Sequence, residues 1–136
     1  MDEEVRGGAR ATAPGAAAKA VGADLGRRGE DLAVAHLEAQ GLVVLSRNWR
    51  CREGELDVVA TDGTRVVFCE VKTRSGERFG SPALAVDPVK ARRVRRAAAA
   101  WFAAHHVGWC EARFDVICVV LPPTGPAVLE HLVGVF

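Results

Sequence analysis

The chain of 136 residues and 14.5 kDa has the length of a single domain with its own core. Its 49% hydrophobic and 26% charged residues exclude a disordered or fibrous protein, and no apolar run is long enough for a membrane-spanning helix. With 18 basic and 17 acidic residues the net charge is +1, so the charge of the whole chain gives no argument for long-range attraction to nucleic acid, and any electrostatic footprint must be local.

The first 22 residues are rich in alanine and glycine and show no apolar periodicity. Burial of such small side chains cannot offset the entropy cost of ordering them. We therefore expect a flexible tail over residues 1–22, with a transient helix as the alternative, and a single domain over residues 23–136. The tail lacks the apolar core of a secretory signal. The four cysteines show neither C-x-x-C pairs nor zinc-finger spacing, so we expect a cytoplasmic protein with reduced thiols.

A helix of about four turns is predicted over residues 24–41, where apolar residues recur at helical spacing and Gly41 supplies a stop. Glu30 shares a stripe with Leu37, so its carboxylate is expected to face the protein rather than the solvent. The glycines at positions 26 and 29 are expected to let that face approach its neighbour closely.

Strands and a second helix follow in an order typical of a mixed α/β fold. Two segments flank Asp62-Gly63, which is a strong hairpin signal. The helix should cross over to a parallel strand, giving a mixed sheet with helices packed on it. The predicted elements after the first helix are strands at 42–50, 55–61 and 65–73, a loop at 75–82, a helix at 86–105, and strands at 113–121 and 127–135.

Charged residues at alternate positions mark the two central strands. If Asp62-Gly63 forms a two-residue loop, Asp57 pairs with Phe68, and four charged side chains project from one face of the hairpin: Glu55, Asp57, Glu70 and Lys72. Carboxylates this close favour a cation between them. The alternative is a solvent-exposed strand face on which Glu70 and Lys72 form an ordinary surface ion pair. Convergence of the helical Glu30 on the same place favours a metal site.

The oxygen-only character of this cluster suits Mg²⁺ or Mn²⁺, because imidazole and thiolate ligands are absent from the motif. Lys72 then has a role distinct from that of the metal ligands. Its ammonium can hold a water or a phosphate oxygen and stabilise developing charge.

Five blocks in order carry a family resemblance: "GRRGEDLAVAHLEAQG", "RNWRCREGELDVVA", "VFCEVKTR", "FGSPALAVDPVK" and "RFDVICV". They resemble the YraN-like family of small bacterial proteins, which is related to archaeal Holliday-junction resolvases within the PD-(D/E)XK nuclease superfamily. The similarity runs from Asp24 to the C-terminus. It implies a restriction-endonuclease-like α/β fold, a central mixed β-sheet flanked by α-helices, in the order α-β-β-β-α-β-β.

The resemblance also implies a magnesium-dependent catalytic site. Asp57 and Glu70 match the metal-binding acids, Lys72 matches the catalytic lysine, and Glu30 matches the helical glutamate that completes such sites in resolvases. A homodimer is expected by analogy, because resolvases act as symmetric pairs.

The second predicted helix holds the densest positive patch of the chain. Its apolar residues fall on one side of the helix. Four arginines fall on the other side: Arg92, Arg93, Arg95 and Arg96. They are predicted to bind nucleic-acid phosphates, and a solvated helix face is the alternative. Lys90 lies nearer the apolar side, so it either reaches the carboxylate site or lies along the sheet edge with its head in water.

Several other polar or aromatic residues are expected to be structural. Asp115, an acid in an apolar strand, should accept hydrogen bonds or pair with an arginine, with membership of the site as the alternative. His105 and His106 should bond the last helix carbonyls. Trp49 should anchor the core, although stacking on a base is the competing interpretation.

Together these features predict a Mg²⁺-dependent nuclease that hydrolyses phosphodiester bonds of DNA, with branched or single-stranded DNA as the substrate. The competing hypothesis is a nucleic-acid-binding adaptor with a nuclease-like fold and no turnover. A third is a scaffold that binds a protein partner through its sheet edge.

Overall fold

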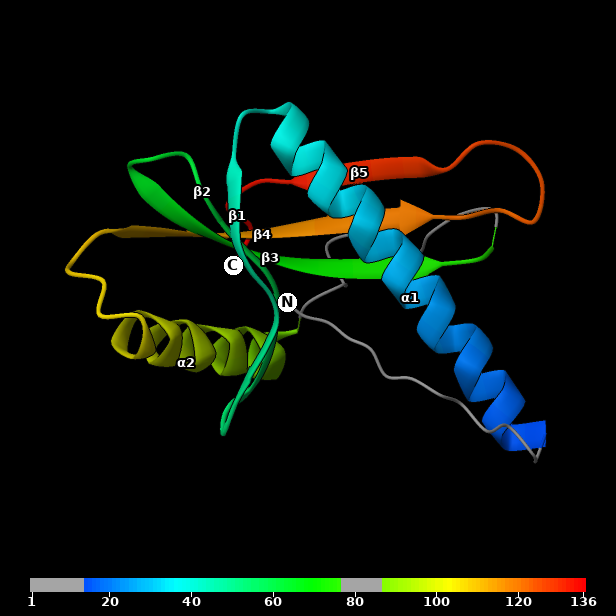
Figure 1. Ribbon diagram of the computed structural model, residues 1–136, viewed down its shortest axis with the longest axis horizontal. Helices are drawn as coiled ribbons and strands as arrows, with labels where there is room; N and C mark the ends of the chain where they lie inside the picture. The colour runs from blue at the N-terminus through cyan, green and yellow to red at the C-terminus, as the bar shows by residue number, and fades with distance from the viewer. Residues whose placement is uncertain (1–13, 77–86) are drawn as a thin grey trace.

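The computed structural model describes residues 14–76 and 87–136, with side chains described from residue 22 onward. It consists of two helices and a five-stranded mixed sheet (Figure 1), and it confirms the predicted order of elements. The strands lie in the sheet in chain order; β3 and β4 run parallel, and the other neighbours are antiparallel. The elements are α1 (Pro14–Ala39), β1 (Val43–Cys51), β2 (Gly54–Thr61), β3 (Arg65–Arg74), α2 (Pro88–Ala104), β4 (Glu111–Val120) and β5 (Val128–Leu132).

The first helix begins earlier than the sequence suggested. α1 starts at Pro14 rather than at Asp24, so the second part of the expected tail is helical, and residues 1–13 lie outside the described residues. The reason is local: alanine has the highest helix propensity, and proline is well tolerated in the first turn. Amphipathic periodicity, on which the prediction relied, detects where a helix packs and misses where it merely continues.

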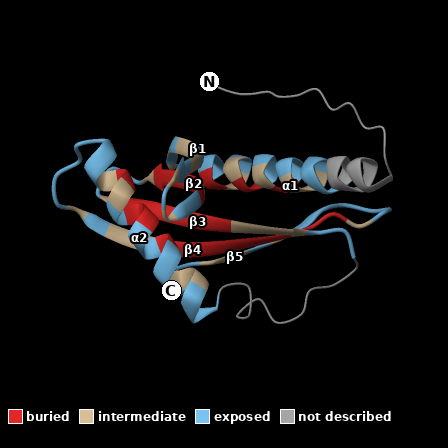
Figure 2. Ribbon diagram, turned by 90° about the horizontal axis from the view of Figure 1, so that it is seen from below, coloured by how far each residue is buried: buried red, intermediate tan, exposed pale blue. Residues whose placement is uncertain are grey.

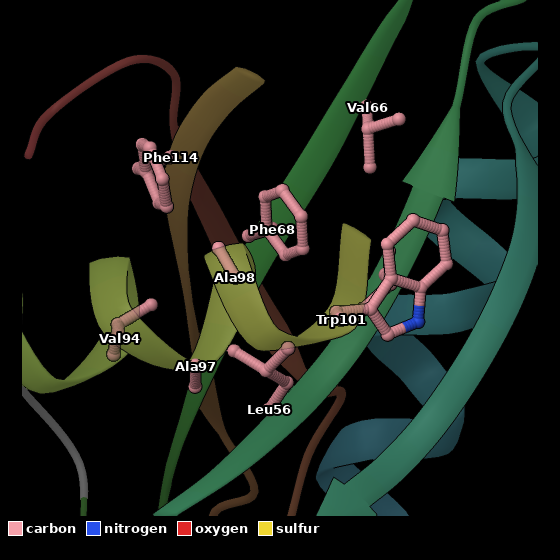
Figure 3. Close-up of a cluster of buried hydrophobic side chains, with 9 residues drawn as sticks. Leu56, Val66, Phe68, Val94, Ala97, Ala98, Trp101 and Phe114 are labelled. Atoms are coloured by element: carbon pink, nitrogen blue, oxygen red, sulfur yellow. The ribbon is translucent and has the colours of Figure 1, made fainter. Parts of the chain in front are cut away.

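The two helices cover opposite faces of the sheet (Figures 1 and 2), each over its own apolar cluster. On the α2 side, Trp101 packs edge-on against Phe68 (Figure 3). The indole N–H of Trp101 donates to Ser46 Oγ at 2.9 Å. On the α1 side, Ala33 and Leu37 are fully buried against the sheet. The α2-side cluster comprises Leu56, Val59, Val66, Phe68, Val94, Ala97, Ala98, Trp101 and Phe114; the α1-side cluster comprises Ala33, Leu37, Val58, Cys69, Ile117, Val119 and Leu121.

One glycine sets the distance between α1 and the sheet. A Cβ built on Gly29 would collide with the side chain of Thr73 in β3, whereas one on Gly26 would meet nothing. The expected close approach is therefore confirmed at Gly29 and wrong at Gly26. Without a side chain at position 29, the turn of α1 that carries Glu30 can rest directly on β3.

The hairpin between β2 and β3 differs from the predicted two-residue loop. Thr61 pairs with Val66 rather than with Thr64. The Asp62 side chain causes the difference, because its Oδ1 accepts hydrogen bonds from the backbone N–H groups of Thr64 and Arg65, both at 2.8 Å. An aspartate that bonds the backbone two and three residues ahead stabilises a wider turn. The predicted register was therefore wrong by two residues.

A shift of two residues preserves the predicted alternation of faces along the paired residues, from Val58 to Thr61 in β2, but changes their partners across the hairpin. Val59 lies opposite Phe68, and Val58 lies opposite Cys69. The backbone pairing ends there, and Asp57 and Glu70 are the next residues of the two strands, so Asp57 is not the partner of Phe68. The two acids of the motif are thus closer than the sequence suggested.

Candidate functional site

A kink in β2 positions Asp57. Leu56 belongs to the α2-side cluster and Val58 to the α1-side cluster, although residues two apart in a regular strand share a face. The neighbouring strand is irregular at the same height, because Asn48 has a left-handed φ of 49°. The predicted simple projection of all four charged residues from one face therefore fails at Asp57, whose side chain turns toward β3.

A side-chain hydrogen bond links β2 to β3 beyond their last backbone pair, Val58 with Cys69. The backbone N–H of Val71 donates to Asp57 Oδ2 at 2.8 Å. The backbone N–H of Asp57 lies near the Glu70 carboxylate and acts to lower its pKa, against the larger effect of burial. These contacts hold the two carboxylates side by side where the backbone pairing of β2 and β3 ends.

Burial makes the negative charge of this pair costly. The side chain of Glu70 is 4% exposed, and burial together with the neighbouring charge of Asp57 raises its pKa from 4.5 to about 7. Burial also raises the pKa of Asp57, although the Val71 N–H and nearby lysines oppose the shift. Two carboxylates in this position disfavour full ionisation unless a cation compensates them.

Lys90 supplies such a cation from the first turn of α2. Its Nζ lies 3.2 Å from Glu70 Oε1. The N-cap residue Asp87 positions this turn, because its Oδ1 accepts the backbone N–H of Lys90 at 2.8 Å. Of the two interpretations left open for Lys90, the one that brings it to the carboxylates is confirmed; its predicted contact with nucleic acid stays a prediction.

Lys72 lies two residues beyond Glu70 in β3 and, by strand alternation, on the same face. Its charge is close enough to lower the pKa of Asp57, after the larger effects of burial, of the Val71 N–H and of Lys90. The site therefore holds two acids and two ammonium groups.

Glu30 stands at the edge of this group. Its carboxylate accepts a hydrogen bond from Asn48 Nδ2 at 3.0 Å. Burial raises the pKa of Glu30, Asn48 opposes that shift, and the charge of Asp57 adds to it. The next residue in α1, Asp31, pairs with Arg47 at 2.7 Å. The helical glutamate thus faces the pair, as predicted, but its hydrogen bonding is directed to β1.

The three predicted metal ligands do not form a closed cluster. Within residues 14–76 and 87–136, no group of three or more His, Cys, Asp or Glu side chains is arranged to hold a metal ion. Asp57 and Glu70 form the close pair, and Glu30 remains apart from it, bonded to Asn48. A metal ion at this site would have two protein carboxylates within reach, with Glu30 as an outer neighbour.

The basic side of α2 lies on the same helix as Lys90. All four arginines are exposed. Arg96 pairs with Glu53 of the β1–β2 turn at 2.9 Å, and the guanidinium of Arg95 lies 4.7 Å from the centre of the Phe114 ring. Arg92 and Arg93, one turn after Lys90, are the members of the patch nearest to the carboxylate pair along the helix.

The structural roles expected for three residues, His105, Trp49 and Asp115, are confirmed. His105 Nδ1 lies 2.8 Å from the Trp101 carbonyl at the end of α2, and Trp49 packs against the α2-side cluster. Asp115 is fully buried and accepts hydrogen bonds from Arg113 at 2.8 and 3.0 Å.

A histidine contact of Asp115 was missed by sequence reasoning. His131 Nε2 lies 2.8 Å from its carboxylate. Strand alternation could have indicated this contact, because His131 is a polar residue in the last strand that shares the covered face with Leu129.

Comparison with known proteins places this architecture in a family. Residues 29–119, which include Glu30, Asp57, Glu70, Lys72 and Lys90, match the model of "Uncharacterised protein family UPF0102". A UPF0102 protein of Frankia alni is 59% identical over 112 residues, covering 82% of this chain and 93% of the relative. One of Mycolicibacterium smegmatis is 53% identical over 115 residues, covering 83% and 93%. One of Mycobacterium marinum is 52% identical over 113 residues, covering 82% and 93%.

In the described part of the chain, neither helix is long and apolar enough to cross a membrane.

Proposed function

This chain belongs to the uncharacterised protein family UPF0102, and we propose that it is a magnesium-dependent nuclease that hydrolyses phosphodiester bonds in DNA. The observation that carries the proposal is the pair of adjacent carboxylates, the half-buried Asp57 and the buried Glu70, held together where the backbone pairing of two strands ends, with ammonium groups beside them. A protein core that needs only stability has little reason to place a buried acid next to a second acid.

The donors present suit a hard divalent cation. Asp57 and Glu70 offer carboxylate oxygens, and magnesium commonly binds through one or two carboxylates while keeping several waters. The raised pKa of Glu70, to about 7, reflects burial and the charge of Asp57, which is the kind of repulsion that a divalent cation relieves. Glu30, bonded to Asn48, would orient waters from outside the pair. When bound, magnesium supplies Lewis-acid polarisation of a phosphoryl oxygen and lowers the pKa of a bound water.

Lys72 and Lys90 would have different roles in the reaction. Lys72, on the same strand face as Glu70, would hold the attacking water or a phosphate oxygen and stabilise the charge that develops on it. Lys90, which pairs with Glu70 at 3.2 Å, would be released from that carboxylate when another cation takes its place, leaving its ammonium available to the substrate phosphate. Arg92 and Arg93 would bind phosphates farther along the strand and fix its register.

The proposal is tested by nicking and cleavage assays with branched, single-stranded and duplex DNA, with and without Mg²⁺ or Mn²⁺. Asp57→Asn and Glu70→Gln keep shape while removing charge, and both should lose at least a hundredfold in cleavage rate. Glu111→Gln, an exposed acid in β4, is the matched control and should keep full activity. Equal cleavage by wild type and Glu70→Gln would refute the assignment.

A non-catalytic nucleic-acid-binding adaptor is the second candidate, and two observations favour it. The ion pair with Lys90 already compensates Glu70, and the described residues lack a three-acid metal cluster. Salt-sensitive DNA binding without cleavage in any metal would support the adaptor over the nuclease.

Sedimentation with and without a four-way junction would test the homodimer expected by analogy with resolvases.

A further inference from the structure

A second polar cluster lies on the other face of the sheet, beneath α1. His131 of β5 and His36 of α1 are 95 residues apart in the chain, and His131 Nδ1 lies 3.1 Å from His36 Nε2. Gln40, one turn after His36, places its side-chain amide 3.0 Å from the same His36 Nε2. The two rings are nearly perpendicular, at 78°, with centroids 5.1 Å apart. Three polar groups thus converge on one small volume.

Asp115 determines which nitrogen of His131 carries the proton. Its carboxylate is fully buried and also accepts from Arg113 and from the backbone N–H of Gly134. A carboxylate held by such donors only accepts, so His131 Nε2 must donate to it. The other ring nitrogen of His131, Nδ1, faces His36.

One position between the three groups can hold either a proton or a cation. Because a half-turn exchanges the amide nitrogen and oxygen of Gln40, a proton on His36 Nε2 can be donated both to His131 Nδ1 and to the Gln40 oxygen. A divalent cation can take the place of that proton, because it accepts the lone pairs of both imidazole nitrogens and of the Gln40 oxygen.

The spacing of the nitrogens fits a tetrahedral metal ion. Imidazole nitrogens bound at about 2.0–2.1 Å to a tetrahedral ion stand about 3.3 Å apart. The observed 3.1 Å needs an opening of only a few tenths of an ångström. Binding through Nδ1 while Nε2 bonds a carboxylate is also the arrangement by which acids behind a metal site orient its histidine ligands.

We propose that His36, His131 and Gln40 form a site for a divalent transition-metal ion of the zinc type, with Asp115 as the positioning residue for His131. Imidazole suits zinc and copper rather than magnesium, so this site and the carboxylate pair would select different ions. The side chain of His131 is 7% exposed, whereas Gln40 is exposed, so the site would be anchored in the core and open to solvent for water or a further ligand. Three protein ligands with an open fourth position allow either exchange of the ion or its use as a Lewis acid.

The experiment titrates zinc into the full-length, EDTA-washed protein in excess magnesium, which competes with zinc for oxygen-ligand sites such as the carboxylate pair. Calorimetry gives the affinity, and long-range ¹H–¹⁵N spectra report each imidazole nitrogen separately. Wild type should bind one equivalent, with shifts at His36 Nε2 and His131 Nδ1. His36→Ala, on a half-buried helix position where alanine is well tolerated, should weaken binding at least tenfold; Gln40→Ala should weaken it less.

His106→Ala is the matched control, because it removes an exposed histidine from the end of α2 and should leave the affinity unchanged. Equal zinc affinity in His36→Ala and wild type would overturn the proposal. So would zinc binding that leaves the two ring signals unmoved, which would assign the ion to cysteine. Ring signals that respond to pH but not to zinc would show a plain hydrogen-bonded pair and overturn it as well.

Discussion

Replacing Glu70 with glutamine separates the stability of the protein from its proposed chemistry. Glutamine has nearly the same shape, and its carbonyl oxygen can still face the nearby backbone N–H of Asp57. What it removes is the negative charge next to Asp57. Lys90 loses its partner, but 45% of its side chain is exposed, so its ammonium can be hydrated. The substitution should therefore stabilise the fold at neutral and alkaline pH.

The magnitude follows from the difference in the pKa of Glu70 between the folded and unfolded chain. Burial first, and then the charge of Asp57, raise this pKa from 4.5 to about 7. Below pH 4.5 the carboxyl is protonated in both states and has no effect. As pH rises toward 7, the unfolded chain ionises freely and the folded chain does not, so stability is lost over that window. At about 1.4 kcal/mol per pKa unit, the loss above pH 7 is up to about 3 kcal/mol.

Thermal or urea unfolding of wild type and Glu70→Gln at pH 4.5 and pH 8 measures this difference. The variant should be more stable by up to about 3 kcal/mol at pH 8, roughly 10 °C in Tm, and nearly equal to wild type at pH 4.5. Magnesium at pH 8 should stabilise wild type and not the variant. Glu111→Gln, an exposed acid, controls for net charge. A Glu70→Gln protein that is less stable than wild type at pH 8 would show that the carboxylate is favourably compensated, and the reasoning would fail.

Three further predictions rest on separate contacts. Lys90→Met removes the ammonium 3.2 Å from Glu70 and should destabilise the metal-free protein by about 1–3 kcal/mol at pH 8 and much less at pH 4.5, measured by urea unfolding. Gly29→Ala should destabilise the fold by about 1–3 kcal/mol because its Cβ meets Thr73, whereas Gly26→Ala should be neutral or stabilising; unfolding of the two variants side by side checks this, and equal effects would contradict it. Arg92→Ala combined with Arg93→Ala should lower the slope of log affinity against log salt by about 1.8 for duplex DNA, and an unchanged slope would place the phosphates elsewhere.

The fold could be predicted from the sequence to the level of element order, because hydrophobic periodicity reports which face of each element is buried. The register of the β2–β3 hairpin could not, because Asp62-Gly63 indicated a two-residue loop, while the Asp62 carboxylate bonds two backbone N–H groups and widens the turn. The two-residue loop and the wider turn differ little in free energy, and a sequence pattern does not show which of them is more stable.

In the candidate site, contacts between residues close in the chain could be predicted, and contacts between distant segments could not. Asp57, Glu70 and Lys72 lie within 16 residues of one another, so strand alternation was enough to group them. Helical spacing left two positions open for Lys90, at the site or along the sheet edge, because its contact with Glu70 depends on how α2 docks on the sheet. The contact between His36 and His131 joins residues 95 positions apart, and nothing in the pattern of either element could have indicated it.

Glu70 lies in β3 at the point where α2 stops covering the strand. Along the α2 side of this strand, Val66 and Phe68 lie under the apolar face of the helix, while Glu70 lies at its first turn, where the neighbours are Lys90 and solvent. A carboxylate at that position is buried enough to have its pKa raised to about 7, yet it is within reach of a cation arriving from outside. A leucine there would extend the core and, because it removes the buried charge, stabilise the fold. Retaining Glu70 costs stability at neutral pH, and this cost is the physical reason to look for a ligand at this end of the strand.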